Sequence, residues 1–269
     1  MTVRQLRASD RQALSDSSVA VAVACLCTSS AFSQAPAFLP SARAPTGPGS
    51  ISGVWTPADF DRNVFLSPEK SAIKTIEGEP PPLQPWVIQI MEKRRQDAKE
   101  GHPYASLQSR CLPSGMPQMM FATGLPKQTL ETAGQVTILS EELSFFRIIH
   151  LNAQHAKHPD PSYMGDSVGH WEGGDLVVDT IGISEKTQLP DGILHSEKLH
   201  LVERYRRTSK DRIELLMTFE DPKAFLRPWT TVTHLKLEPS KRIQEYYCDN
   251  NRNIAVGDQT TTVLPADTN

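Results

Sequence analysis

The chain has 269 residues, a formal net charge of −3 at pH 7 and a sequence pI near 6.2. This charge, together with the lack of any Lys/Arg run interleaved with aromatic residues, argues against nucleic acid as a partner. Once a leader is removed, the remaining length fits one compact domain, or one domain with an elaborated edge.

The first 33 residues have the pattern of a secretory signal peptide. A basic leader precedes an apolar run at residues 19–27, and small residues stand at positions 31 and 33. The leader contains three arginines, Arg4, Arg7 and Arg11. The apolar run is shorter than the roughly 20 residues that cross a bilayer, so we expect no membrane span. The mature protein is therefore expected to be periplasmic or secreted, and a lipoprotein anchor at Cys25 is the alternative.

Residues 34–50 are rich in Pro, Ala, Ser and Gly and predict a flexible tether. Residues 51–269 then predict a single β-barrel domain, whose first strand contains Gly53-Val54-Trp55. An insertion at residues 80–127 follows this strand. It comprises a helix that begins at Pro85 and a long loop.

Beyond residue 128, short strand patterns follow one another without intervening helices. They lie at residues 129–139, 145–151, 165–181, 199–206, 213–219, 230–237 and 243–248. Such spacing indicates an antiparallel meander. We therefore predict a mainly β fold, an antiparallel up-and-down barrel of about eight strands, which is a size that suits a small ligand-holding barrel.

Outside the leader the chain has two cysteines, Cys111 and Cys248. In an oxidising compartment such a pair most simply forms one disulfide, and two buried free thiols are the alternative. Neither cysteine has a second Cys or a His at ligand spacing, so no metal site is expected there.

Alternation along the predicted strands places charged side chains on faces that are otherwise apolar. Four charged residues are placed inside the barrel in this way: Arg147, Asp179, Glu203 and Glu245. One interpretation is a salt-bridge network that fixes the barrel. The other is a pocket in which carboxylates with raised pKa values do acid–base work. In such a pocket Glu203 exchanges protons, Arg147 holds an anion, and Tyr205, Glu245 and Asp179 contact the ligand.

A second group of polar residues is predicted at the rim of the barrel. His195 lies at a loop-to-strand junction and is expected to act as a general base that Glu197 orients. His170 is a further catalytic candidate at this rim. Three more residues are expected to bind the ligand there: His158, Asp160 and Trp171. No tight ligand motif appears among the histidines, so no metal is predicted.

Several motifs together resemble a family of exported bacterial proteins. They are Cys111-Leu-Pro-Ser-Gly-Met-Pro117, Gly165-Asp-Ser-Val-Gly-His-Trp-Glu-Gly173, Leu176-Val-Val-Asp-Thr180, His195-Ser-Glu197, Glu203-Arg-Tyr-Arg206 and Asp221-Pro-Lys-Ala-Phe225. The resemblance covers most of the mature chain and implies export, but the family is uncharacterised and implies no reaction. The Gly53-Val54-Trp55 start is also similar to the lipocalin-like, or calycin, barrels, which hold small apolar ligands.

Two classes of function follow from these patterns. The first is an exported enzyme without an organic cofactor that applies general acid–base chemistry to a partly apolar metabolite, as a lyase, isomerase, hydratase or cyclase. The second is a non-catalytic, lipocalin-like protein that binds a small apolar ligand. Both make a small molecule the partner of this chain, and neither sets an oligomeric state.

Overall fold

The computed structural model describes residues 49–58, 73–121, 124–246, 253–256 and 259–262. The expected signal peptide, the tether up to residue 48 and Cys248 lie outside these residues. Within the described part of the chain, no helix is both long enough and apolar enough to cross a membrane.

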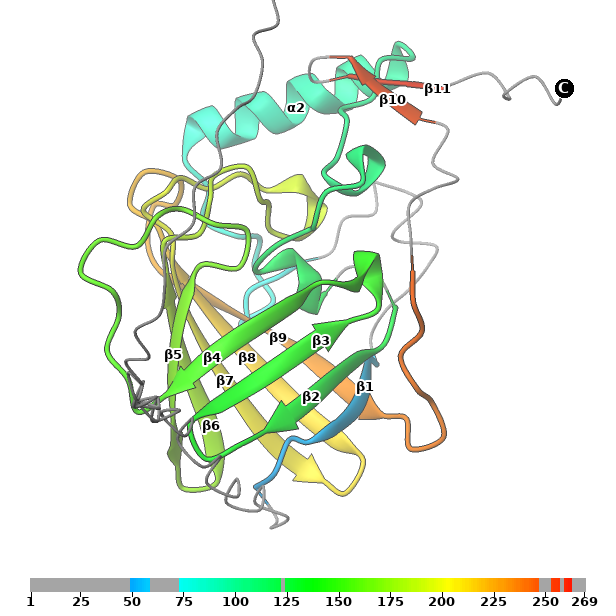
Figure 1. Cartoon of the computed structure of the whole chain (residues 1–269). Helices are drawn as coiled ribbons and strands as arrows, with labels where there is room; N and C mark the ends of the chain where they lie inside the picture. Colours follow the sequence, from blue (N-terminus) through cyan, green and yellow to red (C-terminus); the bar gives the residue numbers. More distant parts are fainter. Residues whose placement is uncertain (1–48, 59–72, 122–123, 247–252, 257–258, 263–269) are drawn as a thin grey trace, which may run out of the picture. The chain divides into compact units, whose positions relative to one another are not determined.

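Nine strands form a closed barrel (Figure 1). In chain order they are β1 (Gly53–Pro57), β2 (Lys127–Glu131), β3 (Gln135–Ser140), β4 (Phe146–Leu151), β5 (Asp166–Glu172), β6 (Asp175–Ile181), β7 (His200–Ser209), β8 (Arg212–Glu220) and β9 (Trp229–Leu237). Each strand pairs with the next along the chain, and β1 pairs with β9. The predicted mainly β barrel is confirmed, with nine strands in place of about eight.

The last strand of the prediction, at residues 243–248, is not formed over 243–246, which have no regular structure. The barrel closes without it, because Trp55 and its neighbours on β1 pair with β9. A separate two-stranded sheet is formed by β10 (Asn253–Val256) and β11 (Gln259–Thr262).

One pair of neighbouring strands departs from the predicted antiparallel meander. β4 and β5 run parallel, with His150 opposite Val168 and Leu151 opposite Gly169. Parallel neighbours need a crossover, because the chain must return to the same end of the sheet before the next strand begins. Residues 152–165 make this return and pass along the outside of the barrel (Figure 1).

The hairpin predicted around the glycine pair is present as β5 and β6. Glu172 pairs with Asp175, so the turn consists of Gly173 and Gly174 alone. Their φ angles are 58° and 97°, in the left-handed region that glycine adopts without a steric penalty. A two-residue turn with both φ angles positive matches the right-handed twist of the flanking strands.

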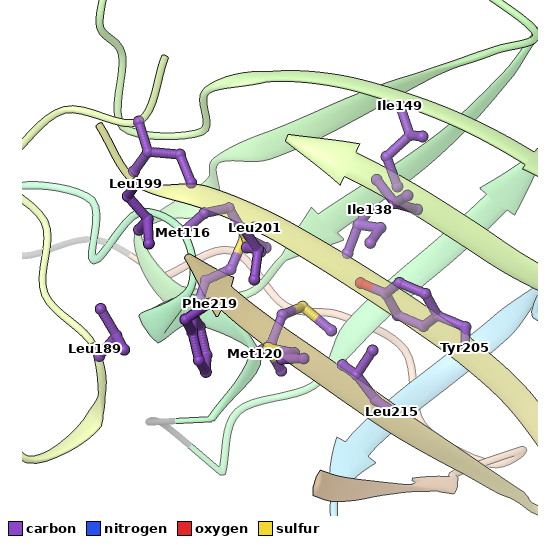
Figure 2. Close-up of a cluster of buried hydrophobic side chains, with 14 of the residues drawn as sticks. Met116, Met120, Ile138, Ile149, Leu189, Leu199, Leu201, Tyr205, Leu215 and Phe219 are labelled. Atoms are coloured by element: carbon purple, nitrogen blue, oxygen red, sulfur yellow. The ribbon is translucent and has the colours of Figure 1, made fainter. Parts of the chain in front are cut away.

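The interior of the barrel is filled by side chains from alternate strand positions and by methionines of the insertion (Figure 2). The buried cluster includes Met116, Met120, Ile138, Ile149, Leu189, Leu199, Leu201, Tyr205, Leu215 and Phe219. Each buried side chain of this size contributes about 1.5–3 kcal/mol to stability. The two methionines come from the loop after the helix, so that loop is part of the core.

The predicted helix is confirmed as α2 (Pro85–Lys99), and it begins with proline as expected. Val87 and Met91, one turn apart, are buried. Trp86 and Ile90, also apolar, are 39% and 37% exposed. Trp86 instead donates its indole N–H to the backbone oxygen of Lys223 at 2.7 Å, which fixes α2 to the β8–β9 connection.

In the part of the chain that the structure describes, four 3-10 helices lie in the connecting segments. They are η2 (Gln108–Arg110), η3 (Gln118–Met120), η4 (Glu142–Ser144) and η5 (Pro190–Gly192). Cys111 follows η2 directly, and β10, a few residues beyond Cys248, contacts η2. This contact brings the two chain segments near each other, but the disulfide itself stays a prediction because Cys248 lies outside the described residues.

Candidate active site

The barrel interior contains a polar network around Arg147. Its Nη1 and Nη2 donate to the two carboxylate oxygens of Glu203 at 3.0 and 2.5 Å. Nε and Nη2 donate to Oγ of Ser167 at 3.2 and 3.1 Å, and Nη2 reaches Oγ1 of Thr180 at 2.9 Å. The hydroxyl of Tyr205 donates to Glu203 at 2.8 Å. Every nitrogen of the guanidinium group therefore has a partner.

The electrostatics of this network favour a positively charged Arg147 and a neutral Tyr205 hydroxyl. Burial opposes the charge of Arg147, but the Glu203 carboxylate outweighs it, and the pKa of Arg147 is raised. Burial, followed by the charge of Glu203, raises the pKa of Tyr205. The structure thus brings Arg147, Glu203 and Tyr205 together inside the barrel, as predicted. Their bonds are those expected of the salt-bridge interpretation, and a catalytic role for them stays a prediction.

Two of the four charged residues predicted inside the barrel are not there. On β6 the buried residues are Leu176, Val178 and Thr180, so Asp179 lies on the outer face, with its side chain 41% exposed. The apolar character of Val177 and Ile181 misled the assignment of the inner face. Glu245 is exposed and lies outside any strand. The prediction of an inward position is wrong for both acids.

On the outer surface, Asp179 joins two histidines. Nε2 of His155 lies 2.9 Å from one of its carboxylate oxygens, and Nε2 of His200 lies 2.8 Å from the other. The far nitrogens face further acids: Nδ1 of His155 is 3.1 Å from Asp166, and Nδ1 of His200 is 3.7 Å from Glu220. We call these five residues the His–Asp chain.

The carboxylate of Asp179 is the central charge of the His–Asp chain. Partial burial would raise its pKa, but the bonds from His200 and His155 prevail, and the pKa of Asp179 is lowered. It is therefore an anion at neutral pH. Both ring nitrogens of His155 face carboxylates. His200 differs, since its Nδ1 lies beyond normal hydrogen-bond length from Glu220.

The His–Asp chain borders an open groove of about 500 Å³, which His200 lines. The groove is lined by Lys157, His158, Pro159, Pro161, Ile181, Gly182, Glu185, Ser196, Glu197, Lys198, Leu199, His200 and Lys223. Three lysines and two histidines face two glutamates there, so the groove is more basic than acidic. The prolines, Ile181 and Leu199 add apolar surface.

The parallel pairing of β4 and β5 explains how these residues come together. The crossover at residues 152–165 runs outside the sheet and carries His155, Lys157 and His158 across to the end of β6. An isolated parallel bridge between Ser162 and Ile183 joins the crossover to the segment that follows β6. Strand β7 supplies His200 at its first position. The groove is thus formed where the crossover meets the β6–β7 connection.

The predicted rim base, His195, is buried and does not line the groove. Its Nδ1 donates to the backbone oxygen of Ser196 at 2.9 Å, and Thr187 Oγ1 lies 2.8 Å from its Nε2. Burial lowers the pKa of His195. A neutral imidazole with both nitrogens engaged holds the β6–β7 connection together, and the role of His195 as a base stays a prediction.

The remaining predicted residues divide between the groove and the surface. His158 and Glu197 line the groove and are exposed. Asp160 and His170 are exposed and do not line it, and Trp171 packs against the buried core. Within the described residues, no group of three or more His, Cys, Asp or Glu side chains is arranged to hold a metal ion.

Asp221 is a buried residue that the sequence interpretation did not assign to the site. Its carboxylate accepts hydrogen bonds from the backbone N–H of Ser196 at 2.6 Å and of Lys223 at 3.0 Å. The hydroxyl of Ser196 donates to it as well, at 3.0 Å. Ser196 and Lys223 both line the groove, so Asp221 positions two of its walls. The Asp221-Pro222 turn after β8 was the available sequence signal.

Replacing Asp221 with asparagine should lower the free energy of unfolding by about 1–2 kcal/mol. The amide keeps one acceptor oxygen but replaces the other by an NH2 group, which cannot accept a hydrogen bond from the donors that face it. Urea denaturation of the two proteins measures the difference. An exposed acid, Asp160, provides the control: its asparagine variant should unfold like the wild type, and an equal loss in both variants would contradict the role of Asp221.

Comparisons with protein-family models, with curated proteins and with solved structures each found no match to this chain.

Proposed function

We propose that this protein is an exported, periplasmic or secreted enzyme without an organic cofactor, which performs general acid–base chemistry in the groove. The observation that carries the proposal is the pairing of Asp179 with His200 at the groove wall. A carboxylate that holds one imidazole nitrogen fixes the ring and stabilises its protonated form, while the other nitrogen is left to exchange a proton.

In this arrangement Nδ1 of His200 takes a proton from the substrate, and Asp179 stabilises the imidazolium that forms. His158 and Glu197, also in the groove, are the candidates to return a proton at another atom of the substrate. The lysines favour a substrate with an anionic group, and the apolar wall residues favour a hydrocarbon portion. Proton removal and return of this kind serves a lyase, isomerase, hydratase or cyclase.

The proposal is tested by screening the purified protein against a metabolite extract and then assaying variants on the substrate found. His200→Gln and Asp179→Asn should each lower kcat/KM about a hundredfold, the usual size of a general acid–base contribution. His150→Gln is the matched control, because His150 is an exposed histidine on β4 that does not line the groove. Full activity of a folded His200→Gln variant would contradict the proposal.

A binding protein of lipocalin-like character is the second candidate. It is favoured by the start of the first strand, where Trp55 is buried, donates its indole N–H to the backbone oxygen of Ile51 at 2.8 Å and lies beneath the guanidinium of Arg207. In this case the groove holds its ligand unchanged. The same screen distinguishes the two candidates: recovery of a retained, unaltered metabolite without any turnover supports binding.

A further inference from the structure

A second polar cluster lies in the barrel wall, away from the groove. Lys127, the first residue of β2, is 2% exposed, and the strand register places it opposite Ser140 of β3, which is also buried. Its Nζ donates to the backbone oxygen of Leu125 at 3.0 Å. The charges that act on it come from Glu142 and Glu141, which follow β3.

The acid of this cluster is only partly satisfied. Glu142 is 3% exposed and accepts a hydrogen bond from the hydroxyl of Ser114 on its Oε2, at 3.0 Å. In the described part of the chain, its Oε1 and the Oγ of Ser140 are buried without a hydrogen-bond partner. Buried polar atoms without a partner are few in native proteins, because each one costs free energy to remove from water.

The charge states of the cluster suit reaction with a carbonyl group. Burial, only partly offset by Glu142, lowers the pKa of Lys127 to about 8. At pH 7 its neutral, nucleophilic form is then on the order of a hundredfold more abundant than for an exposed lysine. Burial also raises the pKa of Glu142, against the hydrogen bonds from Ser114 and Gln108 and the charge of Lys127. A nucleophilic amine thus lies within electrostatic reach of a carboxyl group that can carry a proton.

We propose that Lys127 forms an imine with a short hydroxy-aldehyde or hydroxy-ketone, whose hydroxyl group bonds to Ser140 and to the unpaired oxygen of Glu142. The unpaired Oγ of Ser140 and Oε1 of Glu142 match a ligand hydroxyl, which donates one hydrogen bond and accepts another. This site is separate from the groove and involves none of its residues.

The step balances within the site. The lone pair of Nζ attacks the carbonyl carbon, and the π electrons of the C=O bond move to oxygen. That oxygen takes a proton from the carboxylic acid of Glu142, and the nitrogen returns a proton to the carboxylate. Loss of the hydroxyl group as water, with Glu142 again supplying and recovering a proton, leaves a C=N bond on Lys127.

The test uses the full chain with dihydroxyacetone as the probe and cyanoborohydride to reduce any imine to a stable amine. Peptide mapping by mass spectrometry then compares Lys127 with Lys210, an exposed lysine. At pH 7 Lys127 should be modified about tenfold faster, because burial slows entry but raises the neutral fraction. Urea-unfolded protein, in which all lysines are equivalent, should show no difference.

Ser140→Ala and a second probe complete the experiment. This variant should slow the reaction of Lys127 with dihydroxyacetone but leave its reaction with formaldehyde, which has no hydroxyl group, unchanged. If Lys127 reacts no faster than Lys210 in the folded protein, the imine site is disproved. If Lys127 reacts faster but Ser140→Ala has no effect on either probe, the hydroxy-carbonyl ligand is disproved.

Discussion

Replacing Glu203 with glutamine is expected to lower the free energy of unfolding by about 3–5 kcal/mol. The side chains of Arg147 and Glu203 are fully buried and paired, so the variant leaves a buried guanidinium without its counter-charge. Glutamine has nearly the same shape, so loss of packing contributes little. Chemical denaturation of both proteins under the same conditions measures the effect.

A matched comparison separates charge from hydrogen bonding in the same network. Tyr205→Phe removes only the bond from the tyrosine hydroxyl to Glu203 and should cost about 1 kcal/mol. A double variant, Arg147→Met with Glu203→Leu, replaces the ion pair by apolar groups and should recover most of the loss. A Glu203→Gln variant as stable as the wild type would show that the ion pair does not stabilise the fold.

The same variant informs the catalytic question. If an activity is found and a folded Glu203→Gln protein keeps the wild-type rate, Glu203 is structural. If the variant loses activity but keeps its stability, the reaction takes place in the barrel interior instead.

The second large effect is a rise of stability with pH that depends on Lys127. In the folded protein Lys127 loses its proton near pH 8, whereas in the unfolded chain a lysine keeps its proton to about pH 10.4. Between these values the unfolded state binds more protons, so the free energy of unfolding increases with pH. The expected increase is about 2 kcal/mol between pH 8 and pH 10.

The increase in the free energy of unfolding with pH ends near pH 10 because of Tyr205. Burial and Glu203 raise its pKa, so above about pH 10 the unfolded chain loses a tyrosine proton that the folded protein keeps, and stability falls. Lys127→Met should remove the increase between pH 8 and pH 10. Lys210→Met, at an exposed position, should retain it. The measurement is a set of urea unfolding curves at pH 8, 9 and 10 for the three proteins.

The sequence predicted the barrel and the helix because both depend on local patterns. Proline at the start of α2 and the glycine pair of the β5–β6 turn each favour one backbone conformation. Alternation placed Glu203 correctly, since the other residues on its side of β7 are large and apolar. On β6 both faces carry apolar residues, so the same rule could not distinguish the side of Leu176 from that of Val177.

The His–Asp chain could not be predicted in this way. It joins residues of the crossover and of β5, β6, β7 and β8, and the parallel course of β4 and β5 brings the crossover to them. Strand direction is a property of the whole sheet, and the alternation in a sequence is the same for either direction. The prediction for Glu245 failed for a related reason. Its segment has a strand-like pattern, but the pairing of β1 with β9 already closes the barrel.

Because of the crossover, the stability of the barrel and the recognition of a ligand depend on different residues. The strands on either side of residues 152–165 hold the barrel together through their own pairing, while most of the crossover itself is exposed. Its length and composition can therefore vary with little effect on folding, as is general for surface loops. A selection experiment that randomises residues 157–161 would thus change the ligand preference of the groove while the barrel keeps its stability.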